Sequence, residues 1–164
     1  MLNTAYRETG HPDRRDQDEM FASFVTFTVA GQMFGIPVIR VQDILTPDVI
    51  ANVPLGPSEV RGLINLRGRI VTVIDVRTRL ALPAPDPNAA HSGMGVTVEK
   101  DGEFYTLLVD TVGDVISLPA HLREANPATL EPLWREIADG VFRTEKNLLV
   151  VLDVGQLLNI RAKA

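Results

Sequence analysis

Two copies of one pattern occur along this chain, and each consists of short apolar segments separated by glycines. Residues 31–45 match residues 102–116, and further along residues 70–76 match residues 148–154. Either match alone is weak, because apolar strands resemble one another. Since both matches occur in the same order and each keeps an aspartate at the same place, they indicate an internal duplication. We therefore expect two similar folding units.

Each copy has the features of antiparallel β-structure. Apolar residues alternate with threonines over residues 25–29, which is the period of a half-buried strand. Asp101-Gly102 is a strong type I′ hairpin signal. Longer strands are expected over residues 36–45 and 105–118. Short strands at this spacing predict small closed barrels, which leave no sheet edge exposed.

These patterns divide the chain into three parts. Residues 1–22 are rich in charge and poor in large apolar side chains, so we expect a disordered tail. Residues 23–87 are predicted to form the first barrel and residues 88–160 the second, together making one domain. The sequence leaves open whether the last strand, residues 148–152, completes the second barrel or returns to the first. One longer helix is predicted over residues 127–138, where apolar side chains recur at helical spacing.

Composition excludes several classes of function. The chain has no cysteine and only three scattered histidines, so we expect neither a thiolate site, nor a metal centre, nor a cofactor. A net charge of −5 argues against nucleic acid as a partner. No apolar run is long enough to span a bilayer, and the first residues lack a secretory signal. A cytoplasmic protein without membrane insertion is expected.

Two pairs of related aspartates require an interpretation. Asp75 and Asp153 each follow an apolar strand, which suggests the paired carboxylates of an aspartic protease. That chemistry needs a Ser or Thr and then Gly after each aspartate, and neither position has them. Helix N-capping is the preferred role, so no enzyme is expected. Asp43 and Asp114 form a second pair, either solvated at strand ends or available to a partner's cation.

The segment 61–80, RGLINLRGRIVTVIDVRTRL, reads as a strand, a tight turn, a strand and a short helix. The turn falls at Arg67-Gly68. An arginine on a turn is most often solvated, but its rigid set of donors also suits carboxylates or carbonyls of another protein. The equivalent residue in the second copy is Glu145, so the duplication has not kept the arginine for packing. We favour a role for Arg67 in partner recognition.

These residues resemble the CheW family of bacterial chemotaxis adaptors. The likeness extends from Phe24 to about Ile160, and it is most specific in the Asn65-Leu-Arg-Gly68 hairpin and the strand that ends at Asp75. Residues 109–118 match the family's second copy. The resemblance implies a mainly β fold of two five-stranded, SH3-like barrels packed side by side with a few short helices.

The resemblance also implies a function and a site. Such a protein joins the cytoplasmic hairpin tip of chemoreceptors to the regulatory domain of the histidine kinase CheA, without catalysis, and is recruited to membrane-associated receptor arrays. The family's receptor-binding residues fall on Val41, Asp43, Gly62, Arg67 and Val115. The family commonly has glutamate at position 43, and aspartate is one methylene shorter.

Two alternatives stay open beside the adaptor. The chain could be a scaffold that only associates with itself, whereas a receptor adaptor is expected to be monomeric alone. It could also regulate a histidine kinase in a pathway unrelated to chemotaxis.

Overall fold

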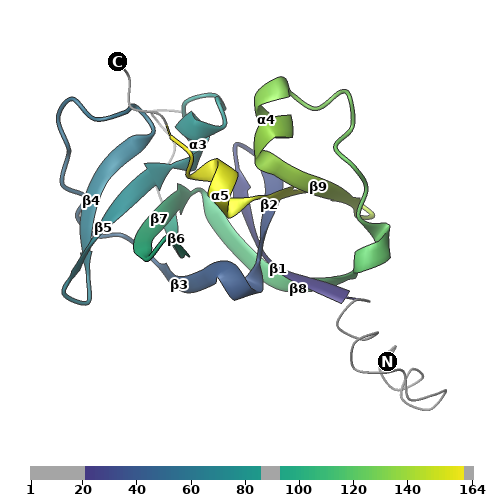
Figure 1. Cartoon of the computed structure of the whole chain (residues 1–164), viewed down its shortest axis with the longest axis horizontal. Coiled ribbons are helices and arrows are strands. Elements are labelled where there is room, and N and C mark those ends of the chain that lie inside the picture. Colours follow the sequence, from purple (N-terminus) through teal and green to yellow (C-terminus); the bar gives the residue numbers. More distant parts are fainter. Residues whose placement is uncertain (1–20, 86–92, 161–164) are drawn as a thin grey trace, which may run out of the picture.

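The computed structural model describes residues 21–85 and 93–160, and Figure 1 shows its two curled sheets side by side. No helix in these ranges is long and apolar enough to cross a membrane. In chain order the elements are β1 (Phe21–Val29), β2 (Gln32–Pro37), the 3-10 helix η1 (Val38–Arg40), β3 (Val41–Leu45), β4 (Val60–Leu66), β5 (Arg69–Asp75), α3 (Val76–Arg79), β6 (Met94–Lys100), β7 (Glu103–Val109), β8 (Thr111–Pro119), the 3-10 helix η2 (Ala120–Leu122), α4 (Pro132–Ile137), β9 (Ala138–Arg143), β10 (Leu148–Leu152) and α5 (Val154–Leu157).

Over residues 21–85 and 93–160, ten strands form two five-stranded sheets. The first sheet has the order β8-β1-β2-β10-β9, and the second has the order β3-β6-β7-β5-β4. Exchanging each strand with its counterpart in the other copy converts one order into the other. The predicted mainly β fold with two five-stranded units is therefore confirmed, and the internal duplication explains why both sheets have the same topology.

The predicted division of the chain at residues 87 and 88 is wrong, because the two copies exchange hairpins. The hairpin of β1 and β2 lies in the first sheet with β8, β9 and β10, whereas β6 and β7 lie in the second sheet with β3, β4 and β5. The strand expected over residues 36–45 is broken by η1, and its two parts enter different sheets. The strand expected over residues 105–118 is likewise broken at Asp110.

The last strand returns to the hairpin of the first copy. β10 pairs in parallel with β2, where Val150 lies opposite Phe34, and in antiparallel fashion with β9. The counterpart pair, β5 and β7, is also parallel and has Thr72 opposite Tyr105. These matching registers settle the question that the sequence left open.

Other expectations concern the chain ends and the helix. The tail predicted over residues 1–22 lies almost wholly outside the described residues, and Phe21 and Ala22 already belong to β1. The helix predicted over residues 127–138 is limited to α4, Pro132–Ile137. Pro132 disfavours helical backbone at the residue before it and suits the first helical position itself, so the helix begins there.

In the described part of the chain, apolar side chains form three clusters. Alternate residues of β10 face opposite sides of the sheet, so Leu149 and Val151 pack with Phe24 and Phe142 in a cluster belonging to the first sheet alone. An equivalent cluster around Val71 belongs to the second sheet. The largest cluster, which we call the shared core, collects side chains from the remaining faces of both sheets and from the helices. The two sheets therefore bury each other.

Aspartates begin the two short helices that follow β5 and β10. Asp75 Oδ1 accepts a hydrogen bond from Thr78 N at 3.4 Å, and Asp153 Oδ1 accepts one from Gln156 N at 3.1 Å. Both aspartates are extended in backbone conformation, as N-cap residues are. The capping role predicted for both residues agrees with this geometry.

Replacing Asp153 by alanine is expected to lower the free energy of unfolding by about 1 kcal/mol, because Gln156 N loses its acceptor. Chemical denaturation followed by circular dichroism measures the change. Asp153→Asn is the control, since asparagine also caps helices and should cost little. An equal loss in both variants would show that Asp153 acts by some means other than capping.

Candidate partner-binding site

Arg67 lies at the tip of the hairpin between β4 and β5. Arg67 and Gly68 have φ values of 53° and 82°, so both central residues of the turn are left-handed, as a type I′ turn requires. Asn65 Oδ1 accepts a hydrogen bond from Gly68 N at 2.9 Å, which stabilises the turn. The Arg67 side chain is 80% exposed. A rigid turn therefore presents a mostly exposed guanidinium.

Asp43 and Arg67 form an ion pair between the two edges of the second sheet. Arg67 Nη2 lies 3.2 Å from Asp43 Oδ2, although β3 and β4 are the two edge strands of that sheet. Asp43 Oδ1 also accepts a hydrogen bond from Ile44 N at 2.8 Å. The carboxylate is largely covered, at 22% exposure, while its arginine partner stays in solvent. The structure thus brings together two of the five residues predicted for the site.

Gly62 supports this region through its backbone. It lies on β4 with φ at 153°, and a Cβ atom there would stand 2.2 Å from Ala51 O. Ala51 and Leu63 exchange hydrogen bonds of 2.9 and 2.8 Å, which join the segment after β3 to β4 and close the curl of the sheet. Gly62 is buried, so its direct contribution is a close backbone approach and not a surface contact.

The two valines predicted for the site lie in different sheets. Val41 begins β3 and packs partly against the shared core. Val115 lies on β8 of the first sheet, opposite Val25 of β1, and is 57% exposed. β3 and β8 are counterpart edge strands, and both lie along the lower side of Figure 1. The five predicted residues therefore extend from the second sheet to the first.

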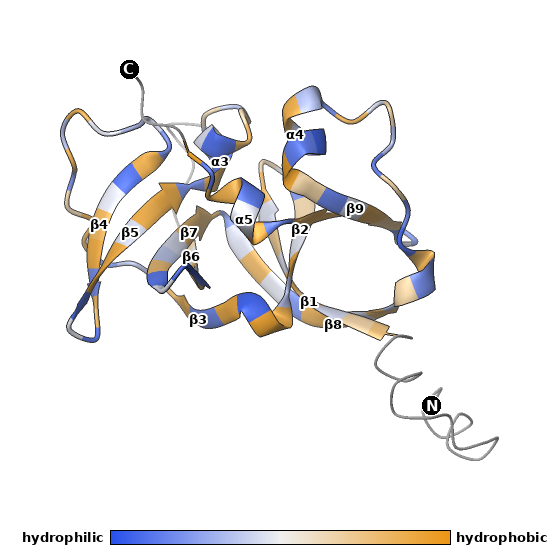
Figure 2. Cartoon of the chain, viewed as in Figure 1, coloured by the Kyte–Doolittle hydropathy of each residue, from blue (hydrophilic) through white to orange (hydrophobic). Residues whose placement is uncertain are grey.

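Exposed apolar residues next to β3 were not anticipated. In η1, Val38 and Ile39 are exposed, Ile39 by 83%, and Ile44 follows on β3. Figure 2 shows apolar (orange) segments on η1 and β3, with blue polar segments between them. The sequence gives no signal for this, because residues 36–45 read as one half-buried strand; the 3-10 turn after Pro37 directs Val38 and Ile39 outward. Of the apolar residues flanking the Arg67 hairpin, Leu55 is fully exposed, whereas Ile64 is buried.

A surface hollow lies beside these residues, between β3, the turn of β6 and β7, and α5. Its lining combines both signs of charge with one large apolar side chain: Ile39, Arg40, Gln42, Glu99, Lys100, Asp101 and Gly155. Arg40 Nη2 donates to Glu99 O at 3.0 Å, and Lys100 Nζ donates to Gly155 O at 3.3 Å. The hollow is open and polar, so it fits contact with another protein better than enclosure of a small molecule.

The described residues contain no group of three or more histidine, cysteine, aspartate or glutamate side chains that could hold a metal ion. Asp75 and Asp153, the residues of the rejected aspartic-protease interpretation, are each engaged as helix caps. Burial raises the pKa of Tyr105, as does its hydrogen bond to Glu103.

Known proteins similar to this chain match it over nearly its whole length. The family model described as CheW-like domain matches residues 23–162. The chain is 26% identical over 135 residues to a probable chemotaxis protein CheW of Rhizobium etli, covering 82% of this chain and 86% of that protein. It is 27% identical over 136 residues to the chemotaxis protein CheW of Klebsiella aerogenes, covering 83% and 81%.

The fold has a solved counterpart. The crystal structure of the scaffolding protein TtCheW from Thermoanaerobacter tengcongensis superimposes with a TM-score of 0.77 at 24% sequence identity. The match covers 88% of this chain and 97% of that one. At this identity the likeness concerns the fold.

Replacing Gly62 by alanine is expected to lower the free energy of unfolding by about 3 kcal/mol, because the new methyl group collides with Ala51 O in a backbone conformation that suits glycine. Thermal or chemical denaturation measures the loss. Gly68→Ala is the matched control: its φ is also positive, but nothing lies within 4 Å of the added atom. Equal losses would show that backbone conformation, and not the close approach, makes Gly62 necessary.

The pair of Asp43 and Arg67 is expected to contribute little to folding. Because Arg67 is mostly exposed, a double-mutant cycle with Asp43→Asn and Arg67→Gln should give a coupling free energy below about 1 kcal/mol. Denaturation of the four proteins measures it. A markedly larger coupling would mean that the pair serves the fold, which would weaken any inference drawn from its effect on binding.

Proposed function

This chain belongs to the CheW-like domain family, and we propose that it couples the cytoplasmic hairpin tips of chemoreceptors to the histidine kinase CheA. Proteins of this family are chemotaxis adaptors without enzymatic activity. The proposal adds the two partners and the residues that bind them. It also places the protein in the cytoplasm, at receptor arrays, and makes it a monomer when alone.

One observation carries the receptor side of the proposal. The segment most specific to the family, residues 62–76, folds into a rigid hairpin whose exposed tip is an arginine held beside a carboxylate. Its guanidinium has donors left for a partner's carboxylates or carbonyls, since one nitrogen faces Asp43 and the side chain is 80% exposed. We assign receptor binding to Val41, Asp43, Gly62, Arg67 and Val115.

Within this surface the five residues have different roles. Val115 offers apolar area to a partner because it is exposed, whereas Val41 is largely committed to the shared core. Asp43 orients Arg67, and Gly62 allows the backbone of residue 51 to lie against β4. The exposed side chains of Val38 and Ile39 extend the same surface beyond the predicted residues. A receptor helix would lay apolar residues against the exposed side chains of Val115, Val38 and Ile39.

The kinase side rests on the resemblance of the CheA regulatory domain to this family. Two proteins built from similar barrels can associate through their barrels, and the ends of the two sheets here differ in charge. The second sheet ends in the hairpin of Arg67, and the equivalent hairpin of the first sheet carries Glu145. Because one hairpin carries an arginine and the other a glutamate, the two sheets can bind partners of different charge.

The proposed mechanism is thermodynamic linkage between the two partners. An adaptor that holds receptor tip and kinase together lets a change in the tip alter which kinase state is favoured. A coupling free energy of about 1–3 kcal/mol is sufficient for such a switch. No proton transfer or covalent step is involved.

Titration calorimetry tests the proposal with the CheA regulatory domain of the same organism and with a fragment of a chemoreceptor tip. Arg67→Glu is expected to weaken receptor binding about tenfold or more, which corresponds to about 1.4 kcal/mol, and to leave kinase binding within about twofold. Arg143→Glu is the matched control, because Arg143 is also an exposed arginine in an ion pair, with Glu124 at 2.8 Å, but lies in the first sheet.

Two outcomes would contradict the proposal. If Arg67→Glu and Arg143→Glu weakened receptor binding equally, the role given to Arg67 would be wrong. If the unaltered chain bound neither partner, and light scattering showed its mass rising with concentration, a self-associating scaffold would replace the adaptor.

A further inference from the structure

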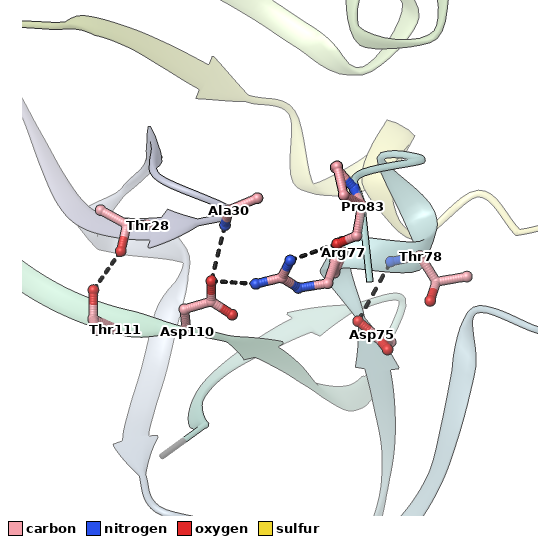
Figure 3. Close-up of polar contacts among 8 residues, drawn as sticks. All are labelled: Thr28, Ala30, Asp75, Arg77, Thr78, Pro83, Asp110 and Thr111. Carbon is pink, nitrogen blue, oxygen red and sulfur yellow. Dashed lines mark hydrogen bonds and ion pairs between the residues drawn. The ribbon is translucent and has the colours of Figure 1, made fainter. Parts of the chain in front are cut away.

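A polar contact joins the two sheets where the chain passes from the second sheet to the first. Asp110 lies between β7 and β8, at that crossing. Its Oδ2 atom accepts a hydrogen bond from Arg77 Nη2 at 2.5 Å and another from Ala30 N at 2.8 Å. Figure 3 shows Arg77 and the turn of Ala30 converging on this one carboxylate. Arg77 belongs to α3, beside the second sheet, whereas Ala30 belongs to the first.

Arg77 makes a second contact that limits its freedom. Its Nη1 atom donates to Pro83 O at 2.5 Å, in the segment that leaves α3. The side chain is only 16% exposed. Because a guanidinium is planar and its nitrogens are fixed relative to one another, holding two acceptors at once fixes the orientation of the whole group.

The turn of Ala30 depends on the same carboxylate. Ala30 has φ at 52° and Gly31 has φ at 80°, a conformation that alanine seldom adopts. The hydrogen bond from Ala30 N to Asp110 gives this turn a partner outside its own hairpin. Asp110 therefore links an unfavourable turn of the first sheet to an arginine beside the second.

The duplicated position on the other side of the molecule lacks this contact. There Gly155 corresponds to Arg77, Ile39 to Asp110, and Asp101 to Ala30, and Asp101 has the same φ of 52°. Glycine has no side chain and isoleucine carries no charge, so no ion pair can form there. These three residues instead line the surface hollow. There Lys100 Nζ donates one hydrogen bond to Gly155 O at 3.3 Å. The ion pair is thus present in one half and replaced in the other by hydrogen bonds to backbone carbonyls, among them those from Arg79 Nε to Leu157 O and from Arg79 Nη2 to Gln156 O, both at 2.8 Å.

We propose that Arg77 is a positioning residue that, through its contact with Asp110, restricts the angle between the two sheets. The shared core keeps the sheets together, but apolar burial is not directional. Charge-assisted hydrogen bonds are directional, and this pair lies at the crossing between the sheets. In the adaptor role, on which this part of the inference rests, a fixed angle lets a partner on one sheet affect a partner on the other.

The angle can be measured in the free protein. The chain has no cysteine, so Arg61→Cys on β4 and Lys146→Cys in the turn before β10 place one spin label on each sheet at exposed sites. Pulsed electron paramagnetic resonance then gives the distance distribution between the sheets. Arg77→Gln is expected to broaden this distribution or shift its mean beyond the spread of repeat measurements.

Two further variants keep the test decisive. Asp110→Asn retains a side-chain oxygen for Ala30 N but loses the charge, and it should broaden the distribution even if Arg77→Gln fails to fold. Arg143→Gln removes an exposed ion pair within the first sheet and should leave the distribution unchanged. Distributions of Asp110→Asn and Arg77→Gln that superimpose on the unaltered protein would overturn the inference.

A second measurement connects the angle to signalling. The affinity for the CheA regulatory domain is measured with and without a saturating receptor-tip fragment. Arg77→Gln should leave each separate affinity within about twofold and bring the ratio of the two kinase affinities close to one. An unchanged ratio would remove the link between angle and coupling. If the unaltered chain bound neither partner, the adaptor proposal would fail, and the distance measurement would still decide the role of Arg77.

Discussion

The burial of the two sheets against each other is the interaction on which the rest of the structure depends. Residues of β10 alternate between two apolar environments, since Leu149 and Val151 face their own sheet's cluster while Val150 and Leu152 face the shared core. If either sheet left its core-facing apolar side chains in water, folding would lose about 1.5–3 kcal/mol of stabilisation for each large side chain. The two sheets therefore form a single folding unit with two non-identical halves. They are not independent barrels joined by a linker.

Exchange of hairpins makes that burial specific. Because β1 and β2 pair with strands of the second copy, and β6 and β7 with strands of the first, each sheet needs both halves of the chain. The same parallel pairing occurs in both sheets: Val150 lies opposite Phe34 in the first, and Thr72 lies opposite Tyr105 in the second. The two copies nevertheless differ at corresponding positions: Arg67 against Glu145 at the hairpins, and Arg77 against Gly155 beside the shared core.

Of the candidate site, only the turn that carries Arg67 could be predicted from local patterns, because the resemblance alone implied the other residues. The turn at Arg67 follows from Asn65 and Gly68. Asn65 accepts a hydrogen bond from Gly68 N, and Gly68 adopts a positive φ easily because it has no side chain. The contact of Arg67 with Asp43 could not be predicted, since it forms only when the edges of a curled sheet approach. The exposure of Ile39 depends on a single 3-10 turn within an apolar stretch.

The sequence by itself determined the mainly β class, the duplication, the positions of the turns, and the two helix caps at Asp75 and Asp153. These features depend on neighbours in the chain, which periodicity and turn chemistry report directly. The tertiary structure alone decided which strands share a sheet, where the last strand pairs, and which apolar residues stay exposed. Strand partners are chosen by how two sheets bury a common core, and a segment of alternating apolar residues fits several partners equally well until that core forms.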